Sequence, residues 1–129
     1  MNTAEFLMIT NAIVPDRTAI VFEGKRFSFS DLNERSNRLA NALAGLGIGK
    51  GDRIAILQVN CNEYVEAYYA TAKLGAIFVP LNFRAKQNEL THMLKHSEAQ
   101  VLLLGKRYAD MAKEMSKELP NIKHFICIE

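Results

Sequence analysis

The sequence predicts an α/β fold: a doubly wound, mostly parallel sheet with an N-terminal β-hairpin. Residues 46–82 have the pattern strand, helix, strand, which requires two parallel strands joined by a right-handed crossover. Two further short apolar runs, at 100–104 and 124–128, alternate with helical stripes. Strand-like runs on either side of Glu23 and Gly24 add the hairpin.

The N-terminal segment predicts a short helix at residues 3–13, capped by Asn2 or Thr3. Its apolar side chains are available for packing: Phe6, Leu7, Ile9 and Ile13. The segment carries no Lys or Arg, which argues against a helix that lies on a membrane surface.

The hairpin follows, with one strand at 18–22, a turn at 23–25 and the partner strand at 26–29. Ser28 and Asp31 have the spacing of a capping box, so we expect a long helix to begin there. One face of that helix is apolar or small: Leu32, Ser36, Leu39, Ala40, Leu43 and Leu46.

Four alternating glycines, Gly45, Gly47, Gly49 and Gly51, suggest a phosphate-binding loop at first sight. A phosphate loop follows a strand and opens a helix, so that the helix-end amides meet the phosphate. Here the glycines close a helix and precede a strand. We therefore interpret them as turn and cap residues with positive φ angles.

The strand at 54–57 is apolar throughout, as expected for a parallel strand buried on both faces. Asn60 and Asn62 offer turn and N-cap chemistry for a helix at 63–74, and Gly75 suits the position after its C-cap. A strand at 77–79 then ends at Pro80. We expect a helix at 87–95, with Leu90, Met93 and Leu94 facing inward, and a later helical stripe: Tyr108, Met111, Ala112, Met115 and Leu119.

The composition is that of a globular protein, with 49% hydrophobic residues, 23% charged residues and a net charge of +2 over 129 residues. Basic and acidic residues interleave, so no nucleic-acid partner is indicated. No apolar run approaches the about 20 residues of a transmembrane helix. Two separated cysteines fit a reducing cytoplasm: Cys127 is expected to be a buried, inert thiol, and Cys61 sits in a turn where it could react.

Candidate chemistry gathers where parallel strands end, because open α/β sheets bind ligands at that edge. The residues in question are 60–62, 82–84 and 105–107. His92 and His96 have the spacing of helical metal ligands, but the sequence supplies no third ligand and no HExxH glutamate. We predict no metal site and no catalytic residue in this chain.

Two segments, GIGKGDRIAIL at 47–57 and KLGAIFVPLN at 73–82, resemble N-terminal signatures of the adenylate-forming acyl-CoA synthetases. The FSFSDLNERSNRLANALAGLG run at 27–47 is similar to that family's first long helix. The resemblance implies an AMP-forming acid–thiol ligase. Such an enzyme converts a fatty or aryl acid with ATP and Mg²⁺ to an acyl-adenylate, and CoA then takes the acyl group as a thioester.

The same resemblance implies that residues 1–129 are one incomplete N-terminal domain, with a helix and hairpin at 1–29 and βα repeats at 30–129. The family's Ser/Thr/Gly-rich loop ending in Pro-Lys-Gly, its aromatic-Gly-x-Thr-Glu segment, its ribose-binding Asp and its C-terminal Lys do not occur here. We therefore expect the chain alone to be inactive and to bind no cofactor.

Arg84 is the one candidate binding residue that the resemblance indicates. It follows Pro80-Leu81-Asn82-Phe83, where CoA-forming relatives often have Pro-Leu-Asn-Pro-Arg, so this chain departs at Phe83. In those relatives the arginine lies on the side from which CoA and the mobile C-terminal domain approach. A planar guanidinium suits phosphate recognition or a docking ion pair.

The alternative is a stand-alone flavodoxin-like module that binds a small ligand or a protein partner. Such a module should be monomeric, with a cooperative melt and no large exposed apolar patch. An incomplete domain should instead expose its hairpin and sheet edges and self-associate through them.

Overall fold

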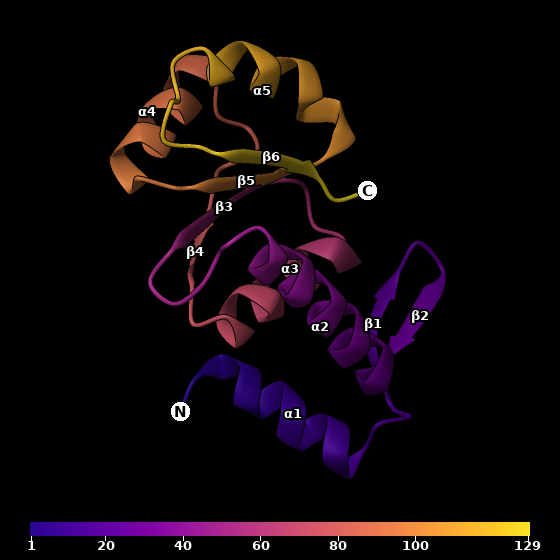
Figure 1. Cartoon of the computed structure of the whole chain (residues 1–129). Coiled ribbons are helices and arrows are strands. Elements are labelled where there is room, and N and C mark those ends of the chain that lie inside the picture. Colours follow the sequence, from indigo (N-terminus) through magenta and orange to yellow (C-terminus); the bar gives the residue numbers. More distant parts are fainter. The chain divides into compact units, whose positions relative to one another are not determined.

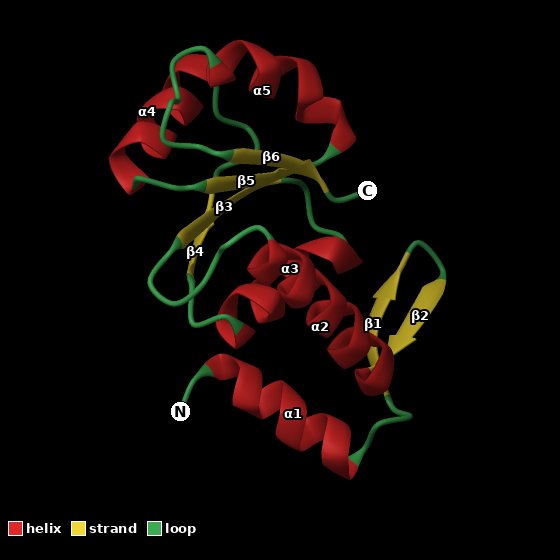
Figure 2. Ribbon diagram, in the orientation of Figure 1, coloured by secondary structure: helices red, strands yellow, loops and turns green.

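The computed structural model describes residues 1–129, and it confirms the α/β fold class with a parallel sheet and an N-terminal hairpin. The chain divides into two compact units (Figures 1 and 2). The helical unit comprises residues 1–50 and 61–76, and the sheet unit comprises residues 51–60 and 77–129. The proposed boundary between residues 29 and 30 stays a prediction.

In the helical unit, α1 (Thr3–Ile13) begins with Asn2, whose side chain accepts a hydrogen bond from the Ala4 amide at 2.8 Å. Leu7 is buried, as expected. The other predicted packing residues are exposed, because none of them lies on the face of the helix that carries Leu7: Phe6, Ile9 and Ile13. That part of the prediction was wrong.

The hairpin consists of β1 (Thr18–Phe22) and β2 (Lys25–Ser28), paired antiparallel. Its turn has two residues rather than three, since Glu23 and Gly24 both take positive φ angles, 48° and 77°. Two consecutive positive φ angles are those of a type I′ turn, whose twist matches that of the strands. Lys25 therefore belongs to β2 rather than to the turn.

Helix α2 (Phe29–Gly45) begins one residue after Ser28, so Phe29 is helical and not part of the strand as predicted. Its predicted capping box is present: the Asp31 amide donates to Ser28 Oγ, and the Ser28 amide donates to the Asp31 carboxylate. Positive φ angles at Gly47 and Gly51 confirm their role as turn residues, whereas the same prediction was wrong for Gly45, the last residue of α2, and for Gly49. The predicted buried face is present, except that Leu39 is half-buried and Leu46 is exposed.

Helix α3 (Asn62–Lys73) begins after Cys61, which is its N-cap residue but makes no side-chain capping bond. Asn60 and Asn62 were predicted as caps; Asn62 is instead the first helical residue and is buried. Gly75 has φ of 68°, as predicted for the position after the C-cap residue Leu74.

The sheet unit contains four parallel strands in the order β4-β3-β5-β6. The strands are β3 (Arg53–Leu57), β4 (Ile77–Pro80), β5 (Val101–Leu104) and β6 (His124–Cys127). Its helical segments are α4 (Gln87–Ser97), the 3₁₀ turn η1 (Lys106–Tyr108) and α5 (Ala109–Ser116). Strands β4 and β6 form the two edges, and β3 and β5 are buried between them.

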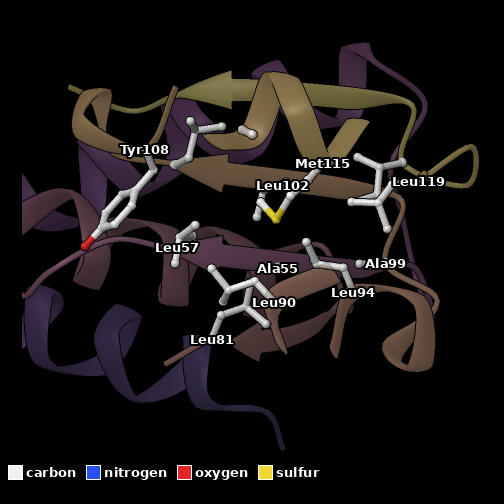
Figure 3. Close-up of a cluster of buried hydrophobic side chains, with 13 residues drawn as sticks. Ala55, Leu57, Leu81, Leu90, Leu94, Ala99, Leu102, Tyr108, Met115 and Leu119 are labelled. Atoms are coloured by element: carbon white, nitrogen blue, oxygen red, sulfur yellow. The ribbon is translucent and has the colours of Figure 1, made fainter. Parts of the chain in front are cut away.

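The core of the sheet unit forms where α4 and α5 cover one face of the sheet (Figure 3). Leu57 and Leu102 point from the strands toward Leu90 of α4 and Met115 of α5. Met93, predicted to face inward, is exposed, and Thr91 is buried in its place on α4. No helix of the chain has both the length and the apolar character that crossing a bilayer requires.

Candidate functional site

The carboxyl ends of the four parallel strands lie together at one edge of the sheet unit. The register pairs Ile56 with Pro80 and Leu57 with Leu104, and Leu104 pairs in turn with Cys127. The loops that follow these strands therefore start side by side. Open α/β sheets bind their ligands at this carboxyl end of the strands.

A hydrogen-bonded network lies at the carboxyl ends of β3, β5 and β6. The Glu129 carboxylate accepts from the Lys106 amide at 2.5 Å and from Gln58 Nε2 at 3.3 Å. The Gln58 side-chain oxygen accepts from the Val59 amide at 2.9 Å, and Gln58 is only 4% exposed. Glu129 thus places a negative charge on the first amide of the helical segment that begins at Lys106, where it is favourable.

Gly105 allows this network to form. A Cβ atom on Gly105 would lie 2.3 Å from the side-chain oxygen of Gln58. The backbone of Gly105 has an ordinary extended conformation, with φ of −77° and ψ of 150°. Glycine is therefore needed here for close approach and not for an unusual φ angle.

Arg84 lies in the loop after β4 and is exposed. The loop is held by Asn82, whose side-chain oxygen accepts from the Arg84 amide at 3.0 Å and whose carbonyl accepts from the Ala85 amide at 3.0 Å. The Arg84 guanidinium lies 5.5 Å from the centre of the Phe83 ring. The exposed Phe83 ring thus orients the Arg84 cation. Phe83 occupies the position at which the family resemblance implies proline.

The other predicted strand-end residues are less closely grouped. Lys106 and Arg107 are exposed cations after β5, and Asn60 is exposed after β3. Asn62 donates to the Glu66 carboxylate of its own helix at 2.9 Å, which is a structural role. The rings of His92 and His96 stack at 6.2 Å, and nowhere in the chain do three or more His, Cys, Asp or Glu residues form a group able to hold a metal ion.

The two thiols differ from the prediction. Burial raises the pKa of the Cys61 thiol to about 11, with a smaller contribution from Glu63, so Cys61 is protonated and unreactive at neutral pH. Cys127 was predicted to be buried, but it is exposed because it lies on the edge strand β6. The strand that contains Cys127 was predicted correctly. The position of this strand in the sheet could not be predicted from the sequence.

Gln58, Gly105 and Glu129 were not singled out as a group from the sequence. Gly105 and Glu129 directly follow apolar runs, and that was the only available signal. The three residues meet because β3, β5 and β6 are neighbours in the sheet. The order of the strands along the chain does not reveal this order in the sheet.

The sequence matches the family model described as AMP-binding enzyme over residues 10–129. It is 36% identical over 118 residues to the crotonobetaine/carnitine–CoA ligase of Salmonella typhimurium. That alignment includes 88% of this chain and 23% of the Salmonella protein. The chain therefore spans about a quarter of the length of the curated relatives it matches.

Solved structures agree with this match. A long-chain-fatty-acid CoA ligase from Rhodopseudomonas palustris superposes with a TM-score of 0.94 at 33% identity, over 100% of this chain and 33% of that chain. An anthranilate CoA ligase bound to anthranoyl-AMP superposes with a TM-score of 0.95 at 26% identity, over 99% of this chain and 25% of that chain. The chain belongs to the AMP-binding enzyme family.

Proposed function

We propose that this chain is the front part of the large N-terminal domain of an ATP-dependent acyl-CoA synthetase that acts on a fatty or aryl acid in the cytoplasm. The observation that carries the proposal is the match over residues 10–129 to the AMP-binding enzymes, together with relatives and structures that are CoA ligases. The full-length enzyme would form an acyl-adenylate from ATP with Mg²⁺ and then a CoA thioester.

Within such an enzyme, we assign this chain a scaffold role and no chemical step. The residues at its strand ends do not fit a nucleotide site. The first amide of the helical segment after β5, that of Lys106, donates to Glu129 and is therefore not available to a phosphate. The chain also offers no carboxylate group suited to Mg²⁺, whose ligands are oxygens at close range. The isolated chain is therefore expected neither to adenylate an acid nor to hold ATP.

Arg84 is proposed to act on the CoA side of the full-length enzyme, either by binding a CoA phosphate or by docking the C-terminal domain. Arg84 is exposed and lies in the loop at the carboxyl end of β4, and both facts support this role. The Phe83 ring that orients its guanidinium supports it as well. A guanidinium held in place loses less freedom when it binds a phosphate than a flexible cation does.

A chimera tests the scaffold role. The 118 aligned residues of the Salmonella typhimurium ligase are replaced by those of this chain, and AMP and CoA thioester are measured with that enzyme's own substrate. We expect ATP-dependent thioester formation by the chimera and none by the isolated chain. A chimera that folds, as judged by circular dichroism, but forms no adenylate would contradict the proposal.

The same chimera tests Arg84. Arg84→Ala should raise the KM for CoA roughly tenfold, about 1.4 kcal/mol, with the KM values for ATP and acid unchanged. Arg17→Ala, which removes an exposed arginine between α1 and β1, is the matched control and should change none of the three. Equal effects of both substitutions would remove the case for Arg84. A small-molecule ligand found for the isolated chain would favour the flavodoxin-like module instead.

A further inference from the structure

Two histidines lie on the exposed face of α4. His92 and His96 are four residues apart on this helix, and both are exposed. Their ring centroids lie 6.2 Å apart, and the angle between the ring planes is 15°. Side chains four residues apart lie on the same face of an α-helix. The helix backbone therefore holds the two imidazoles side by side at the surface.

The nitrogens of both imidazoles are available to a ligand. Neither ring has a hydrogen-bond or ion-pair partner within the chain. A neutral imidazole carries one nitrogen with a free lone pair. Imidazole nitrogen is a preferred ligand of Zn²⁺, Cu²⁺ and Ni²⁺. The pair therefore offers two nitrogen ligands to one transition-metal ion.

Both rings can reach a single ion. A Zn²⁺–nitrogen bond is about 2.0–2.1 Å, so two nitrogens bound to one ion lie at most about 4.2 Å apart. Helices with the HExxH motif place two histidines on one zinc ion with this same spacing. Because the His92 and His96 side chains are exposed, they can rotate to that distance while the helix backbone stays in place. Metal binding thus requires no change in the fold.

The end of α4 favours a cation at this position. His96 lies in the last turn of the helix, where the carbonyl groups carry partial negative charge. The nearest charged residues along the chain, Lys95 and Glu98, are both exposed and have opposite signs, so they add no net charge. Glu89 precedes the pair by three residues, but its carboxylate accepts from the Lys86 amide at 2.6 Å as part of the N-terminal cap. The helix therefore supplies two ligands and not three.

We propose that His92 and His96 chelate one divalent ion of the late first-row transition metals, Ni²⁺, Cu²⁺ or Zn²⁺, with water in the remaining coordination positions. Mg²⁺ and Ca²⁺ do not bind there, because both prefer oxygen ligands. The proposal revises the prediction of no metal site, which was based on the missing third ligand. A closed zinc site needs a full set of protein ligands, whereas a chelate completed by water does not. The inference rests on α4 alone and is independent of the proposed ligase role.

Calorimetric titration with Ni²⁺ is the first test. The 129-residue chain is purified without a polyhistidine tag, and Cys127→Ser removes the exposed thiol, which is itself a metal ligand. We expect saturable binding of one Ni²⁺ per chain. His92→Gln and His96→Gln should each weaken binding about tenfold or more, because only one imidazole of the pair remains. His124→Gln, which removes the only other histidine, is the matched control and should leave binding unchanged.

A change of spacing separates chelation from histidine content. Met93→His combined with His96→Gln keeps two histidines on α4 but places them at adjacent positions, about 100° apart around the helix. Adjacent histidines on a helix cannot both reach one ion, so this variant should bind Ni²⁺ no better than His96→Gln alone. Met93 is 37% exposed, so its replacement removes no core contact. Circular dichroism of each variant establishes that the fold is retained.

Thermal unfolding tests the choice of ion. Ni²⁺ or Zn²⁺ in excess should raise the melting temperature of the Cys127→Ser protein, because the ion binds the folded helix more tightly than the unfolded chain. The same concentration of Mg²⁺ should not. A chain that binds no Ni²⁺ at millimolar concentration would overturn the proposal. Loss of binding with His124→Gln but not with His92→Gln, undiminished binding by the variant with adjacent histidines, or an equal effect of Mg²⁺ would do the same.

Discussion

Gly105 and Gln58 approach each other so closely that no larger residue fits at position 105 without movement. A Cβ atom there would lie 2.3 Å from the Gln58 side-chain oxygen and 2.5 Å from its nitrogen. Gln58 is buried and bonded to both Val59 and Glu129. The contact therefore links the ends of β3, β5 and β6 at the candidate site.

Gly105→Ala should destabilise the chain by about 1–2 kcal/mol, since the buried Gln58 amide must turn away and lose its partners. Urea unfolding monitored by circular dichroism measures the change. Adding Gln58→Ala to Gly105→Ala should cost less than the two single losses combined, because the clash disappears. Gly45→Ala, at the end of α2 with open space around it, should be neutral or slightly stabilising. Equal losses at positions 45 and 105 would contradict the steric explanation.

The ion pair between Arg35 and Glu66 joins α2 to α3. Arg35 Nε lies 2.5 Å from the Glu66 carboxylate, whose side chain is 8% exposed, and this bond raises the pKa of Arg35. Arg35→Met should cost about 1–3 kcal/mol, because it leaves a buried carboxylate without its cation. Arg38→Met removes the exposed pair with Glu34 and should cost less than about 0.5 kcal/mol. Thermal unfolding distinguishes the two, and equal losses would show that Glu66 is not effectively buried.

The capping box at α2 should make stability depend on acid pH. Hydrogen bonds from Ser28 lower the pKa of Asp31 below its ordinary value of 3.8. A carboxyl with a lowered folded-state pKa contributes stability above its unfolded pKa and loses it as the pH falls through the folded value. Asp31→Asn should therefore flatten the loss of stability between about pH 5 and about pH 2. Urea midpoints across that range measure it, and an unchanged slope would count against the cap.

The two cysteines should differ in reactivity. At about pH 8, iodoacetamide should label the exposed Cys127 first, because a thiol with a pKa of about 11 is almost wholly protonated. Mass spectrometry of dilute, monomeric protein follows both sites, and Cys127→Ser isolates the Cys61 rate. That rate should rise with pH until about 11. Labelling of Cys61 at the rate of Cys127 at neutral pH would mean that its burial is ineffective.

Much of the fold could be predicted because its signals are local. Ser28 and Asp31 cap α2 as their spacing indicates, and Gly75 ends α3 through a positive φ angle. The apolar run that contains Ile54 is a buried strand, as its composition predicts. Each of these depends on residues within a few positions along the chain, where propensity and periodicity operate.

The errors occur where burial depends on distant partners. The α1 helix is apolar on more than one face, so its sequence could not specify that Leu7 is buried while Phe6 and Ile9 are exposed. Cys127 and Met93 have strand-like and helix-like surroundings, yet both are exposed. An amphipathic pattern predicts which face of a helix is buried only when the apolar residues lie on one side of the helix.

The sequence by itself determined the order and type of the helices and strands, the capping box of α2, the turn glycines Gly47, Gly51 and Gly75, and the family. Only the tertiary structure decided that β6 pairs with β5 and that Gln58, Gly105 and Glu129 meet at the carboxyl end of the sheet. The physical reason is that caps and turns are settled by short-range sterics and hydrogen bonds. Strand order and close approach depend on packing between residues up to 71 positions apart, such as Gln58 and Glu129.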